Sequence, residues 1–268
     1  MDNTFLSEFI FPLVSAVTIQ IIGVFGIFFV FGFLLSMFQQ QTQNLYQRTV
    51  GWKGILWTAW LGTPIHELSH ALMAKLFMHR VTSISLFKPN KRTGGLGHVD
   101  HTYHKWNLWA RIGNFFIGAA PMIFGSLVLY LLFRFLLPGT TFLDLPLYTD
   151  SSLSLIFSTI KQTLSGLLTL SSFSTWQFWL FLYLSSCVAS HLAPSRQDQK
   201  VMIHGFLWLL VVLLLINIAA ILIGVNITDF IVSTNHFLGI FIALFTYALI
   251  ISLIHFIIVF ILSIPFRR

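Results

Sequence analysis

The sequence predicts an all-α integral membrane protein with about six transmembrane helices and a short β-hairpin after the second span. Of its 268 residues, 56% are hydrophobic and only 9% are charged, whereas soluble domains usually carry about 25% charged residues. Its apolar runs are long enough to cross the hydrocarbon core of a bilayer, which takes about 20 residues. The single cysteine, Cys187, excludes an intrachain disulfide and a cysteine-rich zinc site.

Six apolar segments are the predicted spans, and together they form one polytopic membrane domain over residues 1–268. They are residues 9–38, 54–79, 108–137, 176–194, 201–224 and 237–264. The stretch 151–170 is richer in serine and threonine and contains Lys161. We expect an amphipathic helix on the membrane surface there, with a re-entrant segment as the alternative. The first apolar run is too long for a cleaved signal peptide and lacks a basic start, which predicts a retained span.

Positive charge gathers on one side of this predicted topology. The net charge is +7, and basic residues concentrate in the loop 80–107, around Arg196 and Lys200, and at the C-terminus. By the positive-inside rule this side is cytoplasmic and holds both termini, although Arg48 and Lys53 fall on the other side. We therefore expect a multi-pass protein of a prokaryotic plasma membrane. Its basic residues would contact the lipid bilayer and not nucleic acid.

Residues 81–103 do not have the composition of a span. The segment VTSISLF alternates apolar and polar residues, as a half-buried strand does. Turn-forming residues and a second short run follow it. The turn formers are Pro89, Asn90, Gly94, Gly95 and Gly97. This order predicts a β-hairpin that dips toward the membrane, with an irregular basic loop as the alternative.

The second predicted span contains the sequence His66-Glu67-Leu68-Ser69-His70. Residues four apart lie on the same face of a helix, so both imidazoles can bind one metal ion. Glu67 lies about 100° around the helix from His66, where it can activate a water molecule without being a ligand. This HExxH arrangement is typical of zinc peptidases. An unpaired glutamate within a membrane is unfavourable by about 3 kcal/mol, so a purely structural polar network is the weaker alternative.

Three residues just before the HExxH motif predict an interruption of the second span. They are Gly62, Thr63 and Pro64. We expect Thr63 to cap a helix, Pro64 to occupy its first turn, and the span to be broken or kinked there. The site would then open toward the cytoplasm.

A zinc site with two histidines needs a third protein ligand and keeps the fourth position for water. Asp198 is the leading candidate, because Pro194 ends the fourth predicted span and lets the following residues fold back toward the site. The other candidates are His98, Asp100, His101, His104 and His191.

These motifs resemble those of site-2 proteases, which are intramembrane zinc metalloproteases. That family carries HExxH in one span and, later, an Asn-x-x-Pro stretch that leads to a Leu-Asp-Gly whose aspartate is the third zinc ligand. Residues 191–194, HLAP, are similar to the Asn-x-x-Pro stretch, and Asp198 is similar to the ligand aspartate. The step from proline to aspartate is one residue shorter than in the family, and Gln199 replaces the glycine. Residues 94–99, GGLGHV, and 119–121, AAP, are similar to the family's Gly-Gly-Tyr-Val and Ala-Gly-Pro.

The resemblance covers about residues 54–200 and implies a helical core around Zn²⁺, with spans 9–38, 201–224 and 237–264 as accessory elements. It implies that His66, His70 and Asp198 bind the metal and that Glu67 is the catalytic base. Further candidates fall into two groups. Contacts to the substrate or to the transition state are expected from His191 and Asn114, and the substrate-binding hairpin is expected to use Gly95, Gly97, His98 and Val99.

We therefore expect a zinc-dependent endopeptidase that cuts membrane-spanning or membrane-associated proteins or peptides near the cytoplasmic side, and that a separate membrane protein could regulate. One alternative is a non-catalytic zinc-binding membrane protein, such as a pseudoprotease or an immunity or regulatory factor. The intact HExxH motif speaks against it. A metal-dependent lipid enzyme is the other alternative. A metal transporter would need ionisable residues along several spans, and Glu67 is nearly the only acid within them.

The remaining histidines have simpler interpretations. His98, His101 and His104 follow one another at a spacing of three. On a strand, residues three apart point to opposite faces, so a wet interfacial loop is favoured there over a second metal site. In the last predicted span, His255 is expected to form a hydrogen bond between helices.

Overall fold

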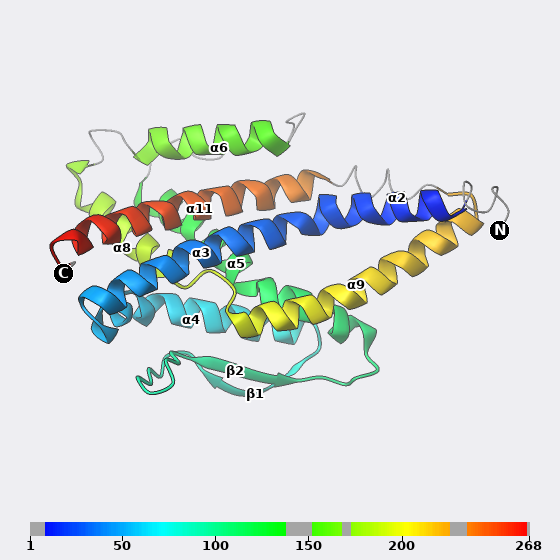
Figure 1. Ribbon diagram of the computed structural model, residues 1–268, viewed down its shortest axis with the longest axis horizontal. Helices are drawn as coiled ribbons and strands as arrows, with labels where there is room; N and C mark the ends of the chain where they lie inside the picture. Colours follow the sequence, from blue (N-terminus) through cyan, green and yellow to red (C-terminus); the bar gives the residue numbers. More distant parts are fainter. Residues whose placement is uncertain (1–8, 138–151, 168–172, 226–234, 267–268) are drawn as a thin grey trace.

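The computed structural model describes residues 9–137, 152–167, 173–225 and 235–266. Its helices lie lengthwise beside one another, with a small hairpin along one side (Figure 1). Among these residues, four helical segments are long and apolar enough to cross a membrane: Phe11–Thr49, Leu108–Leu136, Arg196–Leu222 and Leu238–Phe266. This confirms the prediction of an all-α membrane protein, although two of the six expected spans are not among these four.

The N-terminal helical run is longer than the predicted span 9–38. It consists of α2 (Phe11–Gln20), the π-helical turn η2 (Ile21–Phe25) and α3 (Gly26–Thr49). Helix α11 (Asn235–Ser263) packs beside α3 and ends in the short 3₁₀ turn η3 (Ile264–Phe266). Because Phe28 contacts the ring of Phe245 and Tyr46 contacts that of His255, the two helices run in the same direction.

Two expected spans differ from transmembrane helices in length or composition. Helix α4 (Trp52–Leu76) has the expected length, but it contains the polar HExxH residues. Helix α8 (Trp176–Ala189) has only 14 residues, fewer than the roughly 20 that cross a bilayer. The predicted amphipathic segment forms α6 (Ser152–Leu167), which Figure 1 shows on the outside of the bundle next to α11.

The fourth and fifth predicted spans lie in line with each other along α5 (Leu108–Leu136). Successive residues of α5 contact successively earlier residues of the segment that contains α8, a loop and α9 (Arg196–Leu222). The contacting pairs are Phe115 with Phe206, Gly125 with Leu192, and Phe133 with Phe181. Of the two segments, α9 is one of the four candidate spans by itself, whereas α8 is a shorter apolar helix. Hydropathy detects two apolar runs but cannot tell whether they turn back on each other or continue in line.

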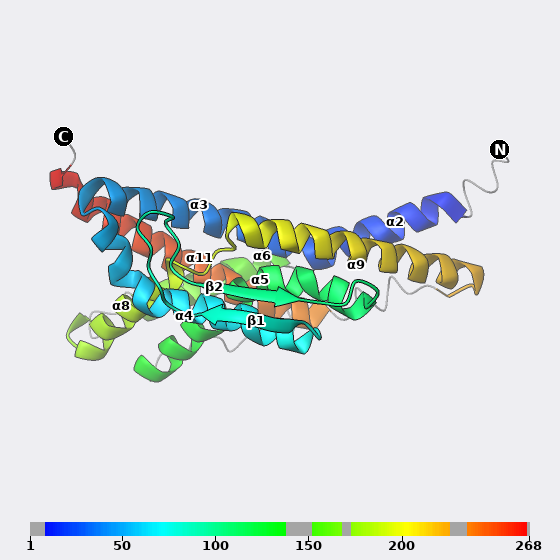
Figure 2. The same cartoon turned by 90° about the horizontal axis from the view of Figure 1, so that it is seen from below.

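The first and last described helices begin and end at opposite ends of the molecule. Helix α2 begins at one end of the longest axis and α11 ends at the other (Figures 1 and 2). The placement of both termini on the cytoplasmic side stays a prediction.

The predicted β-hairpin is present. Strands β1 (Arg80–Ser85) and β2 (His98–Thr102) pair antiparallel, with an irregularity in register between Val81 and Ser83. Its tip turns at Gly94, which has a φ of +73°, a conformation that favours glycine. The hairpin packs on α4, and Figure 2 shows it lying across α4 and α5.

Candidate metal centre

The HExxH residues lie in the middle of α4, which is one continuous helix. The expected break at residues 62–64 is wrong: Pro64 lies inside the helix, and the helix begins at Trp52 without a cap at Thr63. Gly62 has a packing function instead, because a Cβ there would lie 2.2 Å from the carbonyl oxygen of Cys187. The glycine lets α8 approach α4 closely at the level of the motif.

Each motif histidine donates a hydrogen bond to a backbone carbonyl. His66 Nδ1 lies 2.7 Å from the carbonyl oxygen of His191, and His70 Nδ1 lies 2.8 Å from that of Ile117. A carbonyl oxygen only accepts, so the proton of each neutral imidazole is on Nδ1. The Nε2 atom of each ring is therefore left with its lone pair, which is the state that binds a metal.

Both carbonyls are available because a helix is interrupted nearby. Pro121 lies inside α5 and has no N–H to donate to Ile117, the residue four positions before it. Helix α8 ends at Ala189, and carbonyls at a helix end lack partners within the helix. The proline inside α5 and the end of α8 therefore leave free the two carbonyl oxygens that orient the histidines.

Asp198 lies in the first turn of α9, and not in a segment that folds back as expected. Ser195 and Asp198 form a capping box: the Ser195 side chain accepts from the Asp198 N–H at 3.2 Å, and Asp198 Oδ2 accepts from the Ser195 N–H at 2.7 Å. The Ser-x-x-Asp spacing is a sequence signal for this helix start. Gly118 of α5 makes room for it, since a Cβ there would lie 2.5 Å from the Asp198 carbonyl oxygen.

The side chains of His66, His70 and Asp198 converge on one point. The two Nε2 atoms are 3.1 Å apart, His70 Nε2 lies 3.2 Å from Asp198 Oδ1, and His66 Nε2 lies 3.4 Å from Asp198 Oδ2. Ligand atoms bound at about 2.0–2.1 Å to one tetrahedral zinc ion are separated by about 3.3–3.4 Å. The three side chains are only 13%, 8% and 14% exposed. They form the one group of this kind found among the described residues.

The chemistry of these donor atoms fits a divalent cation. Both imidazoles present lone pairs, because their protons are on the carbonyl-bound nitrogens, and a carboxylate is an acceptor only. Lone pairs this close repel one another unless a cation or a proton lies between them. A site with two imidazoles and one carboxylate is also a common ligand set for catalytic zinc.

A cavity of about 260 Å³ opens beside this cluster. Glu67 lines it together with His66, His70 and Asp198. Its opposite wall comes from the hairpin, where Gly97, His98 and Val99 line it. A Cβ on Gly97 would lie 2.8 Å from Glu67 Cγ and 2.7 Å from the Ser85 carbonyl oxygen, so only glycine lets the hairpin approach the glutamate this closely.

The other predicted site residues lie farther from the cavity. Gly95 is at the hairpin tip, where it bridges to Asn90. Asn114 is buried in α5, and neither it nor the His191 side chain lines the cavity. His191 Nδ1 contacts the Ser190 hydroxyl at 2.8 Å, and His191 Nε2 is buried without a hydrogen-bond partner. Among the described residues, it is the backbone carbonyl of His191 that reaches the motif.

The alternative third ligands do not join the cluster. His98 and Asp100 are exposed on β2 and lie near each other, while His104 is exposed beyond the strand. His101 lines the same cavity, but its Nδ1 contacts His79 Nδ1 at 2.8 Å. Burial and the nearby His79 lower the pKa of His101 to about 4. His101 is therefore neutral near pH 7.

Comparisons with family models, with curated proteins and with solved structures gave no match for this chain. The resemblance to site-2 proteases thus depends on the motifs in the sequence and stays a prediction.

Proposed function

We propose that this protein is an intramembrane zinc-dependent endopeptidase that hydrolyses peptide bonds of membrane-spanning or membrane-associated substrates. The observation that carries the proposal is the convergence of His66 Nε2, His70 Nε2 and the Asp198 carboxylate in a cavity that Glu67 also lines. Three ligands and an adjacent carboxylate that is not a ligand are the parts that a zinc peptidase needs.

Each side chain has a separate role in this proposal. His66, His70 and Asp198 would hold Zn²⁺, which lowers the pKa of water toward about 7 and polarises a carbonyl group. Glu67 would take a proton from the attacking water onto its carboxylate and transfer it to the leaving amine nitrogen. The carbonyls of Ile117 and His191 keep the two imidazoles oriented through their Nδ1–H groups.

The hairpin is the proposed substrate-binding element. A helical substrate hides its peptide bonds, so it must unwind before cleavage. In the part of the chain that the structure describes, β2 pairs only with β1, which leaves its other edge available for an added strand. Val99 of β2 lines the cavity, so a peptide added at that edge would pass close to Glu67. The basic residues of this hairpin favour the cytoplasmic side for the site.

The experiment that tests the proposal compares the wild-type protein with Glu67→Gln in cells and in purified form. Membranes from cells producing each protein are analysed for new protein N-termini by mass spectrometry, and the zinc content of each purified protein is measured. We expect Glu67→Gln to keep about one zinc per chain and to lose the new N-termini that the wild type produces, because only the proton-accepting carboxylate is removed.

New N-termini formed at the wild-type level by Glu67→Gln would contradict the proposed mechanism. A wild-type protein that binds zinc and produces no new N-termini would favour the alternative of a non-catalytic zinc-binding membrane protein.

A further inference from the structure

Residues 190–195, here called the α8–α9 loop, have a backbone that is central to the metal centre. Near its start, the carbonyl of His191 orients His66. At its end, Ser195 caps α9 and holds Asp198. Residues 190–194 are all buried, although they form no helix or strand. Buried backbone groups outside regular structure need other hydrogen-bond partners.

Helix α3 supplies these partners from a part of the sequence that contains no metal ligand. The Ala193 N–H donates to Gln39 Oε1 at 3.0 Å, and the Ser36 hydroxyl donates to the Pro194 carbonyl oxygen at 3.2 Å. Both residues face the loop from α3, and the Ser36 side chain is buried. The loop is therefore attached to α3 at two consecutive residues.

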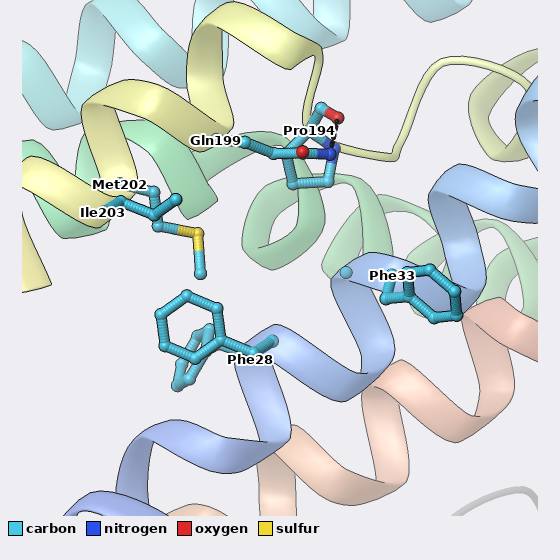
Figure 3. Close-up of a pocket in the computed structure, with 8 residues that line it drawn as sticks. Phe28, Phe33, Pro194, Gln199, Met202 and Ile203 are labelled. Atoms are coloured by element: carbon cyan, nitrogen blue, oxygen red, sulfur yellow. Dashed lines mark hydrogen bonds between the residues drawn. The ribbon is translucent and has the colours of Figure 1, made fainter.

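Gln199 extends this attachment to the residue next to Asp198. Its Nε2 donates to the Ser36 hydroxyl and to the Pro194 carbonyl oxygen, both at 3.3 Å, and Figure 3 shows its contact with Pro194. The site-2 protease motif has a glycine at this position. A glycine has no side chain that could form these two hydrogen bonds. A cavity of about 180 Å³ lies beside these bonds, and Phe28, Phe33, Met202 and Ile203 give it largely apolar walls (Figure 3).

We propose that Ser36 and Gln39 are positioning residues for the metal centre, acting through the backbone of the α8–α9 loop. They fix the loop at Ala193 and Pro194, between the His191 carbonyl on one side and the Ser195–Asp198 cap on the other. The N-terminal helix is then part of the metal-binding unit and not an accessory span. This inference depends on the metal centre of the proposed function and identifies what holds it in shape.

The size of the effect follows from the behaviour of residues that orient metal ligands. Removing such a partner typically weakens metal binding by about 10- to 100-fold, while the ligands themselves remain. Gln39→Leu removes the acceptor for the Ala193 N–H, whereas Gln39→Glu keeps an acceptor oxygen in the same place. Ser36→Ala is milder, because Gln199 still donates to the Pro194 carbonyl.

The test measures zinc affinity of the full-length protein in detergent by competition with a chromophoric chelator, using Zn²⁺ alone. The visible absorption of the Co²⁺-substituted protein then reports on ligand geometry. Thr42→Val is the matched control, because Thr42 is buried on the same helix but bonds only to Phe38 of its own helix. We expect zinc binding to weaken by about 10-fold or more in Gln39→Leu, with an altered Co²⁺ spectrum. Gln39→Glu and Thr42→Val should stay close to the wild type.

Wild-type affinity and an unchanged Co²⁺ spectrum in Gln39→Leu would overturn the positioning role. If Gln39→Leu does not yield folded protein, Gln39→Ala, which removes the same acceptor for the Ala193 N–H, decides the question by the same two measurements, and wild-type values there would equally overturn it. Equal weakening in Thr42→Val would also overturn it, because the effect would then reflect general damage to α3. A wild-type protein that binds no zinc would instead refute the metal centre itself, which is a distinguishable result.

Discussion

The described part of the chain contains two pairs of histidines in close contact, and the two pairs differ in what can hold them together. In α4, His66 and His70 face each other through Nε2 atoms 3.1 Å apart, and both Nδ1 protons are given to backbone carbonyls. At the base of the hairpin, His79 and His101 face each other through Nδ1 atoms 2.8 Å apart. Only His79 has its second nitrogen on a carbonyl, that of Ala110, at 2.9 Å.

This difference decides whether a proton is available between the rings. His79 donates from Nε2 to Ala110, so its Nδ1 is an acceptor, and His101 can donate its own Nδ1 proton to it. The hairpin pair is thus satisfied by an ordinary hydrogen bond. When both rings are neutral, the α4 pair has no such proton, and Asp198 adds a third acceptor beside it. In our proposal these two similar contacts have different roles: the α4 pair binds a cation, and the other pair holds the hairpin in place.

The largest expected effect comes from removing one ligand. His66→Ala should lose bound zinc almost completely, because the remaining imidazole and carboxylate are too few to hold it. His101→Ala should keep about one zinc per chain, because its ring already has a partner. Metal analysis of the two purified variants separates the two pairs, and loss of zinc in His101→Ala alone would reverse the assignment.

A smaller effect is expected when the acceptor for His70 is given a competing donor. Pro121→Ala restores a backbone N–H that can bond to Ile117 within α5, in competition with His70 Nδ1. Zinc binding should weaken by about 10-fold, in the range typical of partners that orient ligands. Chelator competition measures it. Pro64→Ala is the control. Pro64 lies in the helix of the motif, but the carbonyls that orient His66 and His70 belong to His191 and Ile117, which are not in that helix. Unchanged affinity in Pro121→Ala would show that the carbonyl does not orient His70.

The smallest effect concerns pH and the hairpin pair. The pKa of His101 falls from the ordinary value of 6.5 to about 4 in the folded protein. The unfolded chain then binds more protons than the folded one between these values, so stability should decrease as the pH falls from 6.5 to about 4. His101→Gln should show a shallower decrease in thermal stability across that range. Equal pH dependence in both proteins would mean that His101 is not the group responsible.

The local parts of the site could be predicted from sequence. His66, Glu67 and His70 share one helix, so their spacing fixes their geometry. The alternation of apolar and polar residues, followed by turn-forming residues, predicts the hairpin. Asp198 is predicted as the third ligand from the position of Pro194 and from similarity to a family motif, and the capping-box spacing from Ser195 signals the helix start that contains it. Pro121 also carries a readable signal, since a proline inside a helix frees the carbonyl four residues before it.

The long-range parts could not be predicted. Nothing in the local pattern around Ser36 or Gln39 indicates that α3 holds the α8–α9 loop, because the contact depends on how three helices pack. The in-line arrangement of α8 and α9 along α5 could not be predicted for the same reason. Residues 176–194 and 201–224 look like two spans by composition, and only the contacts with α5 show that they continue in line.

The most direct measurement of the central claim is an experimental structure of the full-length protein, purified with zinc and recorded for anomalous scattering at the zinc edge. We expect one anomalous peak between His66 Nε2, His70 Nε2 and the Asp198 carboxylate, with each ligand atom at about 2.0–2.2 Å. An absence of anomalous scattering between these three side chains in protein that was supplied with zinc would contradict it.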